Sequence, residues 1–211
     1  MELKILELSP SHAFAKEEEK KIDSYISVID EYEFESTDLS KYNVLLITYF
    51  VDQEYLYKYK DIIENFLNEG KVVIFCGHLF RNWLPGASLF MPKKINSHKD
   101  YFVQATPGAP LFNGVKMEDM VYNKGVAGFF ARGYYYPPEK AEICLTFTDG
   151  KVISYIDRHS TKGTIILHGG RNILGYMNKN NTTKKISEQL ITLLNKEISG
   201  GVNNEKNSSN L

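Results

Sequence analysis

The sequence predicts an α/β fold in which helices cover a mostly parallel sheet. Two continuous apolar runs, at 44–50 and 72–77, flank a segment over 52–69 whose apolar residues recur at helical spacing. Apolar runs without alternation are typical of strands that are covered on both faces. A strand, a helix and a second strand in this order form the βαβ unit of a parallel sheet. Ligands of such sheets gather at the carboxyl ends of the strands.

The remaining elements of the first half are less regular. A strand is expected over 4–8, and loose alternation over 25–34 is typical of an edge strand. Residues 79–120 are a mixture of Pro, Gly, aromatic and basic residues. An irregular stretch of this length in a compact domain is usually functional or a lid, so this segment is predicted to be an insertion of that kind.

The C-terminal half is expected to add a β-hairpin extension to the sheet. Residues 141–148 and 151–156 are predicted to pair across an Asp-Gly turn. A buried strand follows over 164–168, and a closing helix over 184–198. We therefore expect one domain over 1–198, and a disordered tail over 199–211 because that segment is almost free of apolar residues.

Composition narrows the class of protein. The net charge of −1 gives no general attraction to nucleic acid or to anionic membranes. No apolar stretch reaches the roughly 18 residues of a membrane span. The two cysteines, Cys76 and Cys144, both fall in apolar strand-like segments and form no disulfide framework. These observations predict a cytoplasmic protein that binds neither nucleic acid nor membrane.

Several motifs resemble a known superfamily. They are Glu-Gly-Lys before the strand at 72–77, Pro-Leu-Phe-Asn-Gly-Val over 110–115, Thr-Asp-Gly-Lys-Val-Ile over 148–153 and Lys-Gly-Thr-Ile-Ile-Leu-His over 162–168. In this order they are similar to the class I glutamine amidotransferase-like superfamily, and most similar to its ThuA-like and related non-amidotransferase branches. The resemblance covers about 1–194 and implies a flavodoxin-like three-layer sandwich.

The chain departs from the catalytic pattern of the amidotransferases. Those enzymes place a nucleophilic Cys in a Gly-x-Cys-x-Gly elbow, followed downstream by His-x-Glu. Here Phe75 precedes Cys76, and His168 is followed by two glycines with no Glu. Glutamine hydrolysis needs a thiolate, a base and an orienting carboxylate in line, so the triad is incomplete.

Candidate site residues follow the predicted strand ends. His78 and Arg81 follow one strand, and His168 and Arg171 follow another, the second pair on a glycine-rich turn. Strands of one parallel sheet deliver the residues that follow them to the same edge. We therefore expect one crevice that binds a small anionic or polar ligand, lined by His12, Thr48, His78, Arg81, Arg132, His168 and Arg171.

Each candidate also has a structural interpretation. Cys76 can be a small buried residue of a central strand. The arginines can pair with acids on neighbouring loops, and the run Tyr134 to Tyr136 beside Arg132 can be an edge strand. No zinc-type His spacing, dinucleotide fingerprint or phosphate loop is present, so no metal or cofactor is expected.

Two classes of function remain open. The first is a binding, accessory or regulatory protein of amidotransferase-like fold. The second is a hydrolase or lyase that uses Cys76 or the pair His78 and His168. A homodimer is also expected, because the chain has more Tyr and Trp than one small core can bury. The residues concerned are Tyr55, Tyr57, Tyr59, Trp83, Tyr101 and Tyr134 to Tyr136.

Overall fold

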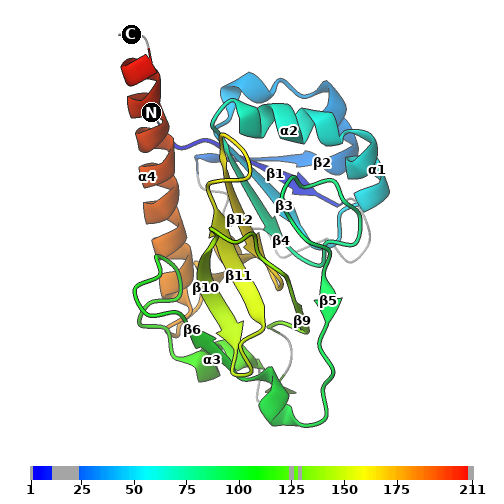
Figure 1. Cartoon of the computed structure of the whole chain (residues 1–211), viewed down its shortest axis with the longest axis vertical. Helices are drawn as coiled ribbons and strands as arrows, with labels where there is room; N and C mark the ends of the chain where they lie inside the picture. Colours follow the sequence, from blue (N-terminus) through cyan, green and yellow to red (C-terminus); the bar gives the residue numbers. More distant parts are fainter. Residues whose placement is uncertain (1, 11–23, 124–125, 128–129, 209–211) are drawn as a thin grey trace.

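The computed structural model describes residues 2–10, 24–123, 126–127 and 130–208, and it has a large mixed sheet at its centre (Figure 1). In this part of the chain the sheet has eight strands in the order β2-β1-β3-β4-β12-β11-β10-β6. The strands from β2 to β12 run parallel, and the other three continue the sheet antiparallel. The predicted α/β class is confirmed.

The parallel half of the sheet consists of strands that were all expected from the sequence. They are β1 (Ile5–Ser9), β2 (Ile26–Asp30), β3 (Val44–Thr48), β4 (Val72–Cys76) and β12 (Thr164–His168). Every residue of β4 and β12 is buried, which explains the absence of alternation in their sequences. No residue of β2 is buried, and the strand lies at the edge, as its loose alternation indicated.

The antiparallel half is built from β11 (Val152–Asp157), β10 (Glu142–Phe147) and β6 (Val103–Ala105). β10 and β11 pair across the turn that holds Asp149 and Gly150, and Gly150 has the positive φ of 85° that this turn uses. Both strands lie inside the sheet, between β12 and β6. β6 comes from the stretch predicted to be irregular, because three residues are too few to give a periodic pattern.

Helices cover both faces of this sheet (Figure 1). The apolar residues of α1 (Gln53–Lys58) and α2 (Lys60–Asn68) pack with the face that carries Phe75, and those of α4 (Lys184–Ser208) pack with the face that carries Cys76. The segment predicted as one helix over 52–69 is divided at Tyr59, which ends α1 and begins α2. Helix α4 continues beyond the predicted end at 198, and the domain boundary there and the disorder of 199–211 stay predictions.

The described parts of the connections contain short elements. They are η1 (Glu31–Ser36), η2 (Leu39–Lys41), β5 (Met91–Pro92), η3 (His98–Tyr101), α3 (Met117–Val121), β7 (Tyr122–Asn123), β8 (Val126–Ala127), β9 (Gly133–Tyr134) and η4 (Ile173–Tyr176). Within the described residues, no helix is both long enough and apolar enough to cross a bilayer.

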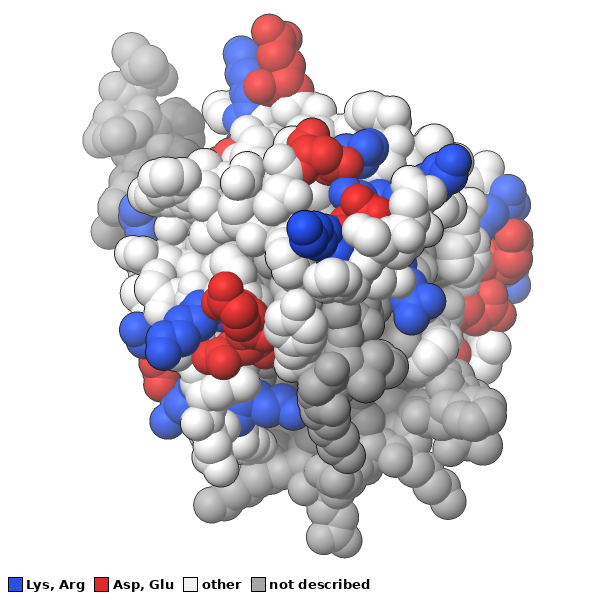
Figure 2. Space-filling model, turned by 90° about the horizontal axis from the view of Figure 1, so that it is seen from below, with Lys and Arg blue, Asp and Glu red and all other residues white. Residues whose placement is uncertain are grey.

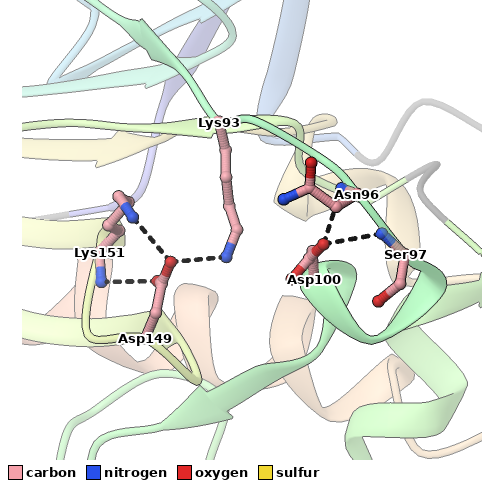
Figure 3. Close-up of polar contacts among 6 residues, drawn as sticks. All are labelled: Lys93, Asn96, Ser97, Asp100, Asp149 and Lys151. Carbon is pink, nitrogen blue, oxygen red and sulfur yellow. Dashed lines mark hydrogen bonds and ion pairs between the residues drawn. The ribbon is translucent and has the colours of Figure 1, made fainter.

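Figure 3 shows two separate sets of polar contacts in the segment after β5, and the first of them joins this segment to the β10–β11 turn. The Lys93 ammonium lies 2.8 Å from an Asp149 carboxylate oxygen, and the Lys151 ammonium lies 2.7 Å from the same oxygen. Asp100 accepts hydrogen bonds from the main-chain amides of Asn96 and Ser97, both at 2.8 Å. Burial alone would raise the pKa of Asp149, but the hydrogen bonds from both lysines outweigh it and lower that pKa to about 2.

Candidate functional site

A row of polar side chains crosses the sheet where the parallel strands end. Thr48 pairs with Cys76, Cys76 pairs with His168, and His168 pairs with Ser154 on the antiparallel strand β11. Residues paired across neighbouring strands point to the same face. The last position of three adjacent parallel strands is therefore polar on one face of the sheet.

This row contrasts with the preceding positions of the same three strands on the face that α4 covers. Two residues earlier in the same strands stand Leu46, Ile74 and Ile166, all buried in the apolar cluster to which α4 contributes. On β1 the equivalent position, paired with Leu46, is Glu7, an acid that is 6% exposed. On β3, β4 and β12 the face thus changes from apolar at Leu46, Ile74 and Ile166 to polar at the carboxyl edge, which is where ligands of such sheets bind.

Cys76 is a buried, protonated thiol. Its pKa is raised to about 12 by burial first, and also by the negative charge of Glu7, while a hydrogen bond involving the Ile173 main chain offsets part of the rise. A nucleophilic cysteine needs the opposite shift, toward the thiolate. Cys76 therefore does not have the electrostatic setting of a nucleophile in this structure.

His168 is a fully buried imidazole beside Cys76. Its ring lies 5.1 Å from that of Phe130 and 5.9 Å from that of Phe112, measured between centroids. In the described part of the chain, neither ring nitrogen has a hydrogen-bond partner. Burial lowers the pKa of His168 to about 3, so the ring is neutral at pH 7. A neutral imidazole offers one hydrogen-bond donor and one acceptor, and here both are available.

His78 lies at the end of β4 in a loop that is held from two sides. Gln53 donates from Nε2 to the His78 carbonyl at 2.7 Å. The Tyr135 hydroxyl donates to the Gly77 carbonyl at 2.7 Å and accepts from the Leu79 amide at 3.0 Å. The His78 ring stacks on Phe90 with centroids 3.9 Å apart, and its pKa is lowered by partial burial and then by the positive charge of Arg132.

Arg81 is directed toward helix α1. Its Nε lies 2.7 Å from a Glu54 carboxylate oxygen, and its guanidinium lies 4.5 Å from the centroid of the Tyr57 ring. Helix α1 covers the face opposite to that of His168. The structure therefore pairs Arg81 with an acid on a neighbouring element and does not bring it to the polar row.

The other predicted residues surround the same edge. Arg132 follows a bridge between Ala131 and Gly170, which comes just after β12, and its charge lies close enough to His78 to lower the pKa of that histidine. The Arg132 carbonyl accepts from the Lys93 amide at 2.9 Å. Arg171 begins the loop after β12 and lies close enough to Tyr176 to influence its pKa. Both arginines are exposed. His12 lies outside the described residues.

Some residues of this edge were not singled out from the sequence. Glu7 could have been found as an acid inside the apolar run of β1, and its carboxylate lies 3.5 Å from the Asn172 side chain. Neither Gln53 nor Tyr135 belongs to a recognisable sequence motif. Only the fold reveals that their side chains hold the loop after β4. Trp83 and Tyr135, two of the residues cited for a homodimer, are buried in the core of this chain.

Charged side chains of both signs lie on the face that Figure 2 presents. Figure 2 shows Lys and Arg side chains next to Asp and Glu side chains on the face that it presents, with wide uncharged areas between them. Among the described residues, no group of three or more His, Cys, Asp or Glu is arranged to hold a metal ion. The distinctive feature is therefore the buried polar row rather than a surface on which all charged side chains have the same sign.

Comparison with known proteins assigns no family to this arrangement. No protein-family model matches the chain, and no curated protein matches it. Membership of the amidotransferase-like superfamily thus stays a prediction from the sequence motifs.

Proposed function

We propose that this protein binds a small polar ligand at the carboxyl edge of its parallel strands, on the face covered by α4, without a cysteine nucleophile. One observation carries the proposal: the Thr48–Cys76–His168 row ends in a fully buried imidazole whose two nitrogens have no partner among the described residues. A buried polar group without a partner is costly, by about 1–3 kcal/mol, and is rare in native proteins. A ligand that pairs with the imidazole removes this cost.

The same proposal places the chain among flavodoxin-like, amidotransferase-like proteins of the ThuA-like branch, as a binding, accessory or regulatory member without a complete Cys-His-Glu triad. The mixed sheet with helices on both faces is compatible with that fold. Two free, buried cysteines are compatible with a reducing cytoplasm. A homodimer remains part of the proposal, since Tyr57 and Tyr136 are exposed.

Ligand binding can be tested by thermal shift against a library of small polar and anionic metabolites. We expect stabilising compounds whose effect weakens at least several-fold in Arg171→Ala, because the exposed Arg171 adds a charge-assisted contact at the rim. The melting temperature without compound should stay nearly unchanged. Lys179→Ala removes an exposed cation from the same loop region and should keep the wild-type response. A library in which no compound stabilises the protein would contradict the proposal.

A hydrolase or lyase that uses Cys76 with His168 is the second candidate. The observation in its favour is that the two residues are direct neighbours on adjacent parallel strands. Against it, burial keeps the thiol protonated and the imidazole neutral, so the pair is not a thiolate–imidazolium pair.

Thiol labelling separates the two candidates. We expect iodoacetamide at pH 7.5 to modify Cys76 only at the rate of unfolding, because the thiol is buried and its pKa is about 12. Cys144, also buried, serves as the internal reference. Cys76→Ser should keep ligand binding. Rapid and selective labelling of Cys76 in the folded protein would favour the enzyme.

A further inference from the structure

Phe112 has a backbone conformation that is unusual for its residue type. Its φ is 68°, and it is the one non-glycine residue with a positive φ among those that the structure describes. The left-handed region is strained for a residue with a Cβ, because the Cβ comes too close to the following carbonyl oxygen. Such strain persists only where the surroundings hold it, and it is concentrated at functional sites.

Helix α4 holds Phe112 in place through the residue that follows it. The Asn113 amide donates to Gln189 Oε1 at 3.1 Å, and Gln189 Nε2 donates to the Asn113 carbonyl at 2.7 Å. The Lys185 ammonium adds a hydrogen bond to the Gly114 carbonyl at 3.2 Å. All three bonds are at the surface, so water can replace them when the loop over 111–114 moves away from α4.

The strained residue covers the unpaired one. Phe112 is completely buried, with its ring centroid 5.9 Å from that of His168. The Gly170 main chain approaches the same imidazole, because a Cβ built on Gly170 would lie 2.6 Å from His168 Nε2. The strained backbone of Phe112 thus lies beside the unpaired, buried imidazole of His168. Movement of Phe112 would relieve the backbone strain and expose the imidazole.

We propose that His168 is the innermost contact of the ligand site, and that the loop over 111–114 is a closure over it which Gln189 holds shut. This inference rests on the proposed function and names the chemistry of the same site. The His168 imidazole lies among phenylalanine rings and is uncharged. It provides one hydrogen-bond donor and one acceptor. Its complement is an uncharged group that both donates and accepts a hydrogen bond, such as an alcohol hydroxyl.

The closure can be tested by acylation of histidine with diethyl pyrocarbonate, read out by peptide mass spectrometry. The unprotonated ring nitrogen of a neutral imidazole attacks a carbonyl carbon of the reagent, and ethyl carbonate leaves. The other ring nitrogen then loses its proton, which the ethyl carbonate takes up as it decomposes to ethanol and carbon dioxide. We expect Gln189→Ala to raise the labelling rate of His168 about tenfold, since two hydrogen bonds are worth roughly 1–1.5 kcal/mol and 1.4 kcal/mol is a factor of ten. Labelling of the exposed His98 and His159 should not change.

Matched measurements keep this test decisive. Glu188→Ala alters the neighbouring exposed position of α4 and should leave the labelling of His168 unchanged. Opening of the loop alone should give a rate that is independent of low concentrations of urea. If His168 is labelled no faster in Gln189→Ala than in the wild type, or only with the urea dependence of global unfolding, the closure is overturned even where the thermal-shift screen finds ligands.

The ligand class has its own test in the ring resonances of His168, followed by nuclear magnetic resonance. Ethylene glycol is an uncharged probe with hydroxyl groups, and formate is an anion of similar size. We expect ethylene glycol to shift the His168 resonances in Gln189→Ala at lower concentration than in the wild type, and formate to leave them unchanged. If only formate shifts the His168 resonances, or if neither probe does, the proposal of an uncharged ligand group is overturned.

Discussion

Replacement of His168 by Asn is expected to remove much of the acid sensitivity of this protein. In the folded state burial lowers the pKa of His168 to about 3, whereas the ordinary value is 6.5. Below pH 6.5 His168 binds a proton in the unfolded chain but not in the folded chain. The free energy of unfolding therefore falls as the pH decreases toward 3. Each pKa unit is about 1.4 kcal/mol, so by pH 4.5 the wild type should lose roughly 2–3 kcal/mol through this residue.

Urea denaturation at pH 7 and pH 4.5 measures this effect. The informative quantity is the change in unfolding free energy between the two pH values, since His168→Asn can also alter stability at pH 7. His98→Asn changes an exposed histidine and should retain the full wild-type pH dependence. An equal pH dependence in the wild type and in His168→Asn would mean that the ring is not held neutral by burial.

The parallel half of the fold was predictable because its strands are buried on both faces. Such strands read as continuous apolar runs, and those of β3, β4 and β12 begin at the predicted residues. The break at Tyr59 was not predictable, since apolar spacing continues through it. The place of β6 at the far edge of the sheet depends on pairing with β10, which lies about forty residues later in the chain.

The site was predictable only as an edge of the sheet. Strand ends place His78, Arg81 and His168 at that edge, but the sequence does not show to which face each side chain turns. Register decides this, because side chains alternate between the faces along a strand. His168 has the same orientation as Cys76, whereas Arg81 lies four residues beyond Gly77 in a loop that packs toward α1.

Gln53 is expected to be among the most important polar side chains for stability. It is 2% exposed and makes four hydrogen bonds to the segment after β4. Its Nε2 donates to the His78 carbonyl, and its Oε1 accepts from the Phe80 and Arg81 amides and from Trp83 Nε1. Because each buried group left unpaired costs about 1–3 kcal/mol, Gln53→Ala should lower the unfolding free energy by about 3 kcal/mol or more.

Fluorescence gives a local measure of this loss, because Trp83 is the single tryptophan of the chain. Its indole donates to Gln53 at 3.2 Å and packs edge-on against Phe75, so Gln53→Ala should shift its emission to longer wavelength before any global unfolding. Gln104→Ala, at an exposed position of β6, is the matched control and should change neither stability nor emission.

The variant Gln53→Glu separates the roles of the two amide atoms. The new carboxylate can still accept from the three donors, but it faces the His78 carbonyl without a proton to donate. It should therefore be less stable than the wild type at pH 7, and the gap should narrow on acidification, as the carboxyl group takes up a proton and can donate again. If the gap is the same at pH 7 and pH 5, the bond from Gln53 to the His78 carbonyl contributes little. The position of His78 would then depend on Tyr135 and on stacking with Phe90.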